Sequence, residues 1–429
     1  MDIKKLKERL LASKLFKDSF WALTGTVMGK ALSLFAGIIV ARLLGKEIYG
    51  EYGMIKTTLI NISVFSTLGL GYTGTRFIAK FIQECPSLIN STIRNIYKIT
   101  IGFSSVIFLL VFLFAPEIAE YLEVPETTSA FRVTALAILI NAIDTTQIGI
   151  LAGFKNFKAT AINGSVVGVS TFILSTLLTY FFGLNGSLIA LLSSQVIGTI
   201  LNARAINKSQ KTLTGQEKYV NATKELLSFS VPVALQEFLY TAVAWTSSIF
   251  MVKLSSYEEM GLLGAVSQWI SIIYFIPSVM KNVALSYFSS DGNNNLFNRM
   301  LQINFAATFV PYLFVVLFSG LITSMYGSKY DGLQIVLIIG TIQPIFTSLS
   351  TVIIYEFIAR SRTWLMFFVR FIREASNLIL VWIGLHMFTT NGAIVVSTIQ
   401  VIVAFAFFVI MYIVSQKHLY KKTQSSIKE

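Results

Sequence analysis

The chain contains few of the residues from which enzymes most often build catalytic or metal centres. Among its 429 residues there is one cysteine, Cys85, and there are two histidines, His386 and His418. A single cysteine excludes an intrachain disulfide, a multi-thiolate metal site and a dithiol redox pair. With so little histidine, we also predict no metal centre, no bound cofactor and no histidine-based catalysis.

Charged residues are scarce as well. They make up 13% of the chain, whereas hydrophobic residues make up 54%, and the mean hydropathy is +0.70. A soluble protein of this length needs far more polar surface to cover its core. The composition therefore predicts a protein that lies mostly within a membrane.

Twelve apolar stretches of about twenty residues, separated by short polar loops, run along almost the whole chain. As helices, stretches of this length cross the hydrocarbon core of a bilayer, which is about 30 Å thick. Helices are favoured over a β-barrel because the stretches lack the alternating polar positions that face a barrel lumen. The predicted fold class is all-α, with about 12 transmembrane helices. Their predicted bounds are 18–42, 48–70, 95–114, 130–152, 159–182, 185–206, 226–252, 260–282, 300–323, 332–357, 364–386 and 391–414.

The basic residues are distributed unevenly around these spans. Of the 34 lysines and arginines, 25 lie on the side that carries both termini, five lie on the other side and four lie within spans. Because lysine and arginine are retained on the cytoplasmic side during insertion, both termini are predicted to be cytoplasmic. The same bias, together with attraction to anionic membrane lipids, explains a pI of 9.6. We therefore predict membrane lipids, and no nucleic acid, as partners.

The spans divide into two sets of six. A segment rich in lysine, glutamine and threonine, 207–225, is predicted to be a cytoplasmic linker between an N-lobe, 1–206, and a C-lobe, 226–429. A Gly-x-x-Gly pair begins at Gly50 in the first lobe and at Gly261 in the second, at nearly the same distance after a Ser-Phe pair. This favours a parallel pseudo-repeat with a central cavity between the lobes. The alternative is that Gly-x-x-Gly serves only close helix packing.

The glycine-marked turns resemble those of a known family. Residues 41–53, which read ARLLGKEIYGEYG, and residues 68–71, which read LGLG, are similar to the signature of bacterial polysaccharide-export flippases of the Wzx type. These flippases belong to the multidrug/oligosaccharidyl-lipid/polysaccharide exporter (MOP) superfamily. Residues 153–158, GFKNFK, resemble the short basic turn of the family, and the span count and midpoint linker fit along the whole chain.

This resemblance implies a transporter and not an enzyme. It implies a flippase of the bacterial cytoplasmic (inner) membrane that moves an undecaprenyl-diphosphate-linked oligosaccharide to the outer leaflet by alternating access. The product would be a surface polysaccharide such as O-antigen (the lipopolysaccharide side chain), capsule or exopolysaccharide. A polysaccharide polymerase and chain-length proteins are the protein partners that such a flippase implies.

Ionisable residues within spans are the candidate site residues, because a charge in hydrocarbon costs a few kcal/mol and normally marks a water-filled path. Lys30 lies at the middle of the first span and Arg373 about nine residues inside the eleventh, and both are predicted to bind the diphosphate. Lys56 and Arg370 are further candidates for the same anion. Alternatively, Lys30 pairs with a carboxylate of a neighbouring helix, and Arg370 forms a local i,i+4 ion pair with Glu374.

Three carboxylates also lie within spans, namely Asp144, Glu237 and Glu374. They are candidates for binding sugar hydroxyls or for carrying a proton or Na⁺ that couples transport to a gradient. They could instead neutralise Lys30 and Arg373. Ion coupling is not obligatory, because moving negative charge outward across an inside-negative potential gains ~2.3 kcal/mol per charge per 100 mV.

Other functions stay open at this stage. A cation-coupled multidrug antiporter of the same superfamily would present carboxylates in its first half, whereas the first span carries Lys30 and no acid after Asp18. A membrane-embedded polysaccharide polymerase or glycosyltransferase would need a large outer loop or an acidic metal motif. The longest outer connection, 116–129, is short, and we expect its four glutamates to form a solvated helix face. A non-transporting scaffold would give no reason for charges within spans.

Overall fold

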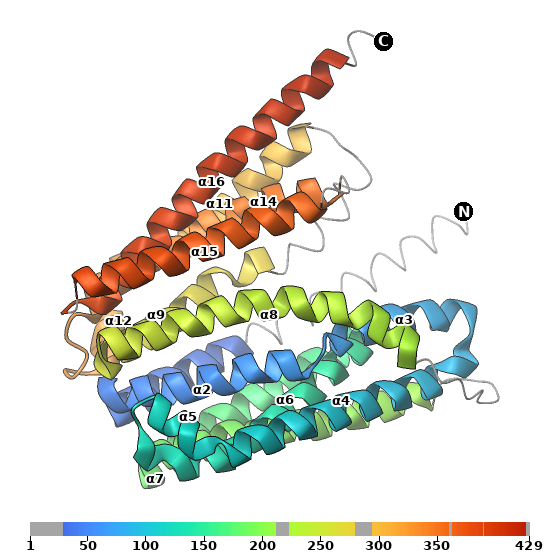
Figure 1. The fold of residues 1–429 in the computed structure, drawn as a ribbon, viewed down its shortest axis with the longest axis horizontal. Helices are drawn as coiled ribbons and strands as arrows, with labels where there is room; N and C mark the ends of the chain where they lie inside the picture. The colour runs from blue at the N-terminus through green and yellow to red at the C-terminus, as the bar shows by residue number, and fades with distance from the viewer. Residues whose placement is uncertain (1–28, 212–222, 279–293, 360–362, 389, 426–429) are drawn as a thin grey trace, which may run out of the picture. The chain divides into compact units, whose positions relative to one another are not determined.

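The computed structural model describes most of the chain, and its regular structure there is helical, without strands (Figure 1). Because every backbone N–H and C=O in hydrocarbon must be bonded within the protein, helices are the structure that such apolar stretches favour. The described residues are 29–211, 223–278, 294–359, 363–388 and 390–425.

The chain forms two compact units, which are not simply its two halves. Unit 1 consists of Met1–Leu44 and Met54–Trp245, and unit 2 consists of Gly45–Gly53 and Thr246–Glu429. The chain therefore passes from unit 1 to unit 2 just before helix α2, returns to unit 1 within α2, and passes to unit 2 again within helix α8. Nine residues of the first half, Gly45–Gly53, are built into the unit that the second half forms.

The helices of unit 1 begin with the helical residues 29–44 and end with the first two-thirds of α8. Helix α6 packs against α3, α4 and α7 and so lies at the centre of the unit. The bounds are α2 (Lys46–Ser66), α3 (Leu70–Glu84), η1 (Pro86–Leu88), α4 (Ile89–Leu113), α5 (Ala115–Tyr121), η2 (Pro125–Thr127), α6 (Thr128–Gly153), α7 (Phe157–Gln210) and α8 (Thr223–Leu254).

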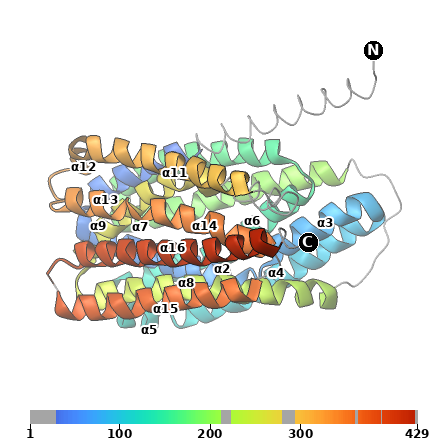
Figure 2. The same ribbon diagram turned by 90° about the horizontal axis from the view of Figure 1, so that it is seen from above.

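The helices of unit 2 pack around α16, which contacts α9, α13, α14 and α15. Figure 2 shows α14, α15 and α16 running alongside one another. The bounds are α9 (Tyr257–Ile273), α11 (Asn294–Leu317), α12 (Ser319–Tyr326), α13 (Leu333–Gly340), α14 (Gln343–Ala359), α15 (Thr363–Met387) and α16 (Gly392–Ser425).

Every predicted span overlaps one or more of these helices, which confirms the all-α membrane fold. Within the described residues, six helices, with α7 counted as one, are long and apolar enough to cross a membrane, or seven if α2 and α3, which meet at a 43° bend, form one broken span. Some predicted spans are interrupted, as at the break between α13 and α14, and others extend into residues outside the described ranges. The count of twelve therefore stays a prediction, as do the lobe boundaries and the linker 207–225, most of which lies outside the described residues.

Helix α7 contains two of the predicted spans, 159–182 and 185–206. Between them Gly183 has φ 56° and ψ −132°, a left-handed conformation that glycine adopts without a steric cost. A Cβ on Gly186 would lie 1.8 Å from the carbonyl oxygen of Leu178, although eight residues of continuous helix would separate the two by about 12 Å. The chain therefore reverses at Gly183, and α7 is a hairpin of two helices.

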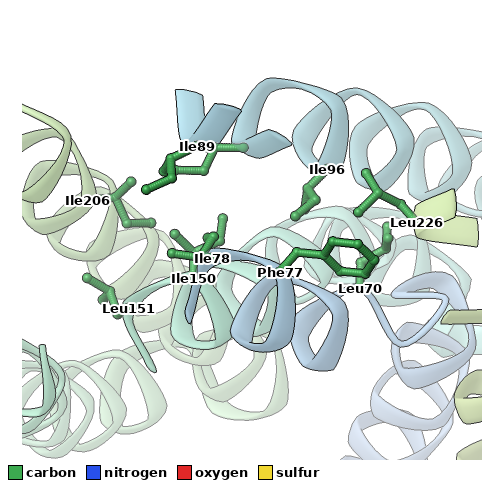
Figure 3. Packing of buried hydrophobic residues seen from close by; sticks show 10 residues of the cluster. Leu70, Phe77, Ile78, Ile89, Ile96, Ile150, Leu151, Ile206 and Leu226 are labelled. Atoms are coloured by element: carbon green, nitrogen blue, oxygen red, sulfur yellow. The ribbon is translucent and has the colours of Figure 1, made fainter. Parts of the chain in front are cut away.

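The connection between the second and third predicted spans, 71–94, is mostly helical. Helix α3 is amphipathic: Leu70, Phe77 and Ile78 are buried, while Arg76 and Lys80 are exposed. The buried face joins a hydrophobic cluster with residues of α4, α6, α7 and α8 (Figure 3). That cluster contains Leu70, Phe77, Ile78, Ile89, Ile93, Ile96, Ile150, Leu151, Ile206 and Leu226.

Glycines bring the helices of unit 1 into backbone contact. A Cβ on Gly149 of α6 would lie 2.1 Å from the carbonyl oxygen of Gly71 on α3, and Thr75 donates a 2.9 Å hydrogen bond to the Gly149 carbonyl. A Cβ on Gly168 of α7 would lie 2.7 Å from the Cα of Gly29. Lipid chains are as apolar as leucine, so close backbone packing of this kind is a main source of helix association in membranes.

In unit 2, the two Gly-x-x-Gly pairs lie against each other. A Cβ on Gly50 of α2 would lie 1.9 Å from the carbonyl oxygen of Tyr257, and a Cβ on Gly261 of α9 would lie 1.9 Å from that of Lys46. Close packing at Gly50 and Gly261 is therefore confirmed, whereas a Cβ on Gly53 would meet nothing within 4 Å. The repeat itself stays a prediction.

Polar and aromatic contacts hold the same end of unit 2 together. Lys46 forms a 2.7 Å ion pair with Glu258, and the side-chain amide of Gln268 donates a short hydrogen bond to the hydroxyl of Tyr49. Tyr326 accepts a 3.1 Å hydrogen bond from the indole of the buried Trp269. The ring of Tyr49 also contacts those of Tyr52 and Tyr330, and Tyr326 contacts Tyr330. The predicted outer loops of this unit therefore lie at the same end of its helices. This is expected when successive spans cross the membrane in alternating directions.

We expect Gly261→Ala to lower the free energy of unfolding by ~1–3 kcal/mol, because its Cβ would overlap the Lys46 carbonyl. The matched control is Gly53→Ala on α2, whose Cβ would meet nothing within 4 Å. Alanine is the better helix former, so Gly53→Ala should keep or slightly raise the stability. Thermal unfolding in detergent, followed by tryptophan fluorescence, measures both. Equal midpoints for the two variants would contradict the close packing.

The lone cysteine gives a test of the predicted orientation. Cys85 is exposed and lies between α3 and α4 on the side predicted to be cytoplasmic. A membrane-impermeant maleimide should therefore label it in inside-out vesicles and not in right-side-out vesicles. Glu120→Cys, made in a Cys85→Ser background, places an exposed thiol on α5 at the opposite end and should label with the reverse preference. Labelling of both from one side would overturn the orientation.

Candidate functional site

A chain of polar side chains crosses the interior of unit 1 at the predicted site residue Asp144. The carboxylate of Asp144 on α6 accepts a 2.9 Å hydrogen bond from the side-chain amide of Asn202, which lies on the second arm of the α7 hairpin. The side-chain oxygen of Asn202 accepts in turn a 2.8 Å hydrogen bond from the side-chain amide of Asn163 on the first arm. Three helical segments are therefore joined by two hydrogen bonds between side chains, and Asn202 is 4% exposed.

The hairpin turn creates this arrangement. Asn163 and Asn202 are 39 residues apart, and they meet only because the chain reverses at Gly183. Gly198 lies beside the carboxylate, because a Cβ there would be 3.4 Å from the Asp144 Oδ1 atom, in ordinary van der Waals contact. Asp144 is itself half-buried.

More polar atoms lie on the α7 face that meets Asp144. Positions 195, 198, 199 and 202 share one helical face by their i, i+3, i+4 and i+7 spacing. On it, the Gln195 Oε1 and Thr199 Oγ1 atoms are buried and have no hydrogen-bond partner among the described residues. Buried polar atoms normally have a protein or water partner. Carboxylate, amide and hydroxyl oxygens on one face are also the groups that bind a proton, a hard cation or a hydrated sugar.

Lys30 belongs to the helical residues 29–44 of unit 1 and is exposed. The preceding residue, Gly29, lies against the backbone of Gly164 and Gly168 on the first arm of α7. Lys30 therefore lies next to a close contact between two helices. That contact does not cover the Lys30 side chain. The structure describes both Lys30 and Asp144, and no ion pair joins them. Asp144 bonds instead to the amide of Asn202.

Arg373 lies in unit 2 on α15 and is held by two contacts. Its guanidinium is 2.8 Å from the carboxylate of Glu374, and the two side chains are 17% and 18% exposed. It also lies over the ring of Phe407 on α16, 5.2 Å from the ring centroid, an arrangement that favours a cation. The structure thus brings two predicted site residues together. Among the described residues, the ion-pair partner of Glu374 is Arg373, its sequence neighbour, instead of Arg370.

The other predicted site residues lie outside these clusters. Lys56 is half-buried on the unit 1 part of α2, and Arg370 is exposed on α15. The position of Glu237 is on α8, but its side chain lies outside those that the structure describes. No group of three or more histidine, cysteine, aspartate or glutamate side chains suited to a metal ion occurs in the described part of the chain.

Sequence reasoning missed a buried carboxylate in unit 2. Glu356 on α14 is 5% exposed, and its Oε2 atom accepts a 3.0 Å hydrogen bond from Ser415 on α16. It lies one residue inside the predicted end of the tenth span, where a carboxylate is expected to reach the headgroups. Asn163, Asn202 and Gln195 were also missed, because only charged residues were considered. Amides on neighbouring predicted spans were the available signal.

The sequence of the chain matches a known protein family. Residues 15–290, more than half of the chain, match the model of a family described as "Polysaccharide biosynthesis protein". An uncharacterized membrane protein of Methanocaldococcus jannaschii, MJ1375, is 24% identical over 267 residues. That match covers 58% of this chain and 62% of the archaeal protein, so the chain spans less than two-thirds of that relative.

Solved structures of transporters share the fold. A multidrug resistance MATE family transporter of the MOP superfamily, in an inward-facing conformation, aligns with a TM-score of 0.76 at 15% identity over 95% of this chain and 99% of the other. The lipid II flippase MurJ, in an inward closed conformation, aligns with a TM-score of 0.71 at 17% identity over 92% and 87%. At these identities the likeness concerns the fold alone. The chain thus has the two-lobe fold of MOP-superfamily membrane transporters and belongs to the polysaccharide biosynthesis protein family.

Proposed function

We propose that this protein is a flippase for an undecaprenyl-diphosphate-linked oligosaccharide, which it moves from the cytoplasmic to the outer leaflet for surface polysaccharide synthesis. The observation that carries the proposal is the match of residues 15–290 to the polysaccharide biosynthesis family, on a fold shared with a lipid II flippase. The diphosphate is the part of the substrate that hydrocarbon excludes most strongly, so cations within the spans are central to the mechanism.

Lys30 supports an anionic substrate. It is an exposed cation near the middle of a predicted span, where an ammonium facing lipid would cost ~2.5–3.5 kcal/mol. A water-filled path beside the helix removes that cost and gives the substrate a hydrated route. In this proposal Lys30 binds the diphosphate, and Lys56, on the neighbouring predicted span, is a second cation along the route.

Arg373 is the corresponding cation of unit 2. Glu374 and the ring of Phe407 fix the guanidinium in place, so less side-chain entropy is lost when it binds an anion. Its planar fork can hold two phosphate oxygens at once. The diphosphate would compete with Glu374 for the guanidinium, and Arg370, which is exposed on the same helix, would attract the anion from the cytoplasmic side.

The energy source follows from the charge of the substrate. Its diphosphate is anionic, so an inside-negative potential favours outward movement by ~2.3 kcal/mol per charge per 100 mV. The carboxylate of Asp144, with amide and hydroxyl oxygens around it, is the candidate for coupling to a proton or Na⁺. Glu237 and Glu374 are further candidates for coupling or for sugar hydroxyls. A polysaccharide polymerase and chain-length proteins would receive the product.

The test is translocation of a fluorescent undecaprenyl-diphosphate oligosaccharide in proteoliposomes under a defined membrane potential. We expect Lys30→Ala and Arg373→Ala each to slow translocation about tenfold or more, because a hydrogen bond to a charged group contributes about 1.5–3 kcal/mol. Glu374→Gln should retain or increase the rate of potential-driven translocation, since it removes the negative charge that competes for Arg373 and keeps the shape of the side chain. The matched control is Lys158→Ala, an exposed lysine on the first turn of α7.

The outcomes separate the rival functions. A wild-type protein that moves no lipid-linked oligosaccharide but exports organic cations against a proton or Na⁺ gradient would be a multidrug antiporter instead. Equal losses in Arg373→Ala and Glu374→Gln would mean that the ion pair matters for the structure and not for capture of the anion. Elongation of the glycan in the vesicles would identify a polymerase.

The role of Asp144 has its own test. Asp144→Asn keeps the size of the side chain and an oxygen that can accept from Asn202, but it cannot bind a proton at this site or attract a cation. We expect it to abolish the acceleration of translocation by an imposed proton or Na⁺ gradient and to leave potential-driven movement within about twofold. Asn163→Ala, which leaves the carboxylate in place, is the control and should keep the gradient response. An unchanged response in Asp144→Asn would refute coupling at this residue.

A further inference from the structure

Unit 1 carries a groove that the translocation mechanism does not use. It lies between the N-terminal half of α4 and the C-terminal end of α7 and has a volume of about 960 Å³, at the upper end of the ~300–1,000 Å³ that ligand sites occupy. A 2.9 Å hydrogen bond from Gln210 to Asn90 joins the two helices at one end. Ile93, which belongs to the same buried cluster as Ile89 and Ile96 (Figure 3), lines the groove. The groove therefore rests on the packed core of the unit.

One end of the groove is cationic. Arg94 and Lys98 are one turn apart on α4 and are exposed, and Lys211 lies at the end of α7. Among the described residues, the side chains that line the groove are neutral or basic. Three positive charges around one opening attract an anion, and the guanidinium of Arg94 can bind two phosphate oxygens at once.

The other end of the groove is apolar. Ile101 is 43% exposed, and Gly102 next to it is exposed, with nothing within 4 Å of the place where a Cβ would lie. These residues lie one to two turns further along α4 toward the predicted membrane interior, since the predicted third span begins at residue 95. The groove thus offers cations at its membrane-surface end and an apolar channel at its membrane end.

We propose that this groove binds an anionic phospholipid of the cytoplasmic leaflet, with the phosphate among Arg94, Lys98 and Lys211 and an acyl chain along Ile101 and Gly102. A free phosphate would use the cations and leave the apolar end empty, whereas a neutral detergent would use only the apolar end. A phospholipid matches both ends at once. It also matches the predicted location, because anionic headgroups at the cytoplasmic surface attract basic side chains by about 1 kcal/mol each. The proposal is independent of the transported substrate.

The experiment is native mass spectrometry of the full-length, delipidated protein titrated with phosphatidylglycerol in neutral detergent. We expect one tightly retained lipid on the wild type. The triple variant Arg94→Gln/Lys98→Gln/Lys211→Gln should bind it about a hundredfold more weakly, since ~1 kcal/mol per charge corresponds to about fivefold. Gly102→Phe keeps all three charges but fills the apolar end, and it should weaken retention at least tenfold.

Controls distinguish the sources of the bound anion. Lys158→Gln removes an exposed lysine outside the groove and should leave retention unchanged. Phosphatidylcholine should be retained at least tenfold less, and inorganic phosphate at equal concentration should not displace the phosphatidylglycerol. Displacement by inorganic phosphate would identify a simple anion site, and equal losses in Lys158→Gln and the triple variant would indicate attraction by net charge alone. Preferential retention of undecaprenyl diphosphate would assign the groove to the transported lipid. Each of these three results overturns the proposal.

Discussion

Contact between helix backbones at glycine is the constraint on which the rest of this structure depends. In a bilayer the helices gain little from hiding apolar side chains, so their association depends on close packing and on polar contacts. Gly71 with Gly149 and Gly29 with Gly168 bring helices of unit 1 together, and Gly50 with Gly261 does the same in unit 2. A methyl group at any of these places would push the backbones apart.

The polar chain of unit 1 is a consequence of that packing. Asn163, Asn202 and Asp144 are within hydrogen-bond distance because the α7 hairpin closes at Gly183 and lies against α6. In a medium of low dielectric, hydrogen bonds are strong, and a buried polar group without a partner is costly. Such a network therefore fixes the positions of its helices relative to one another. The buried oxygens of Gln195 and Thr199 beside it mark the place where the packing leaves polar groups to be satisfied by water, an ion or a ligand.

The two units treat charge differently. In unit 1 the carboxylate of Asp144 bonds to the amide of Asn202, and among the residues that the structure describes it has no cation as a partner. In unit 2 the cation Arg373 is neutralised by Glu374 and stacked on an aromatic ring. An uncompensated carboxylate is suited to bind and release a proton or cation, whereas a compensated arginine must exchange one anion for another. This difference supports the proposed roles of Asp144 in coupling and of Arg373 in binding the diphosphate.

The sequence by itself determined the all-α membrane fold, because apolar runs of about twenty residues have few other stable structures, and the glycine-marked turns indicated the family. It also indicated Arg373, since a charge within a span is costly wherever it lies. Tertiary structure decided what each charge meets: Glu374 is paired with Arg373 instead of Arg370, and Asp144 is bonded to Asn202. It decided that one face of α3 is buried, that Gly50 lies against Gly261, and that Glu356 is buried. Those facts depend on which helix faces turn toward each other, and hydropathy is nearly the same on every face of a membrane helix.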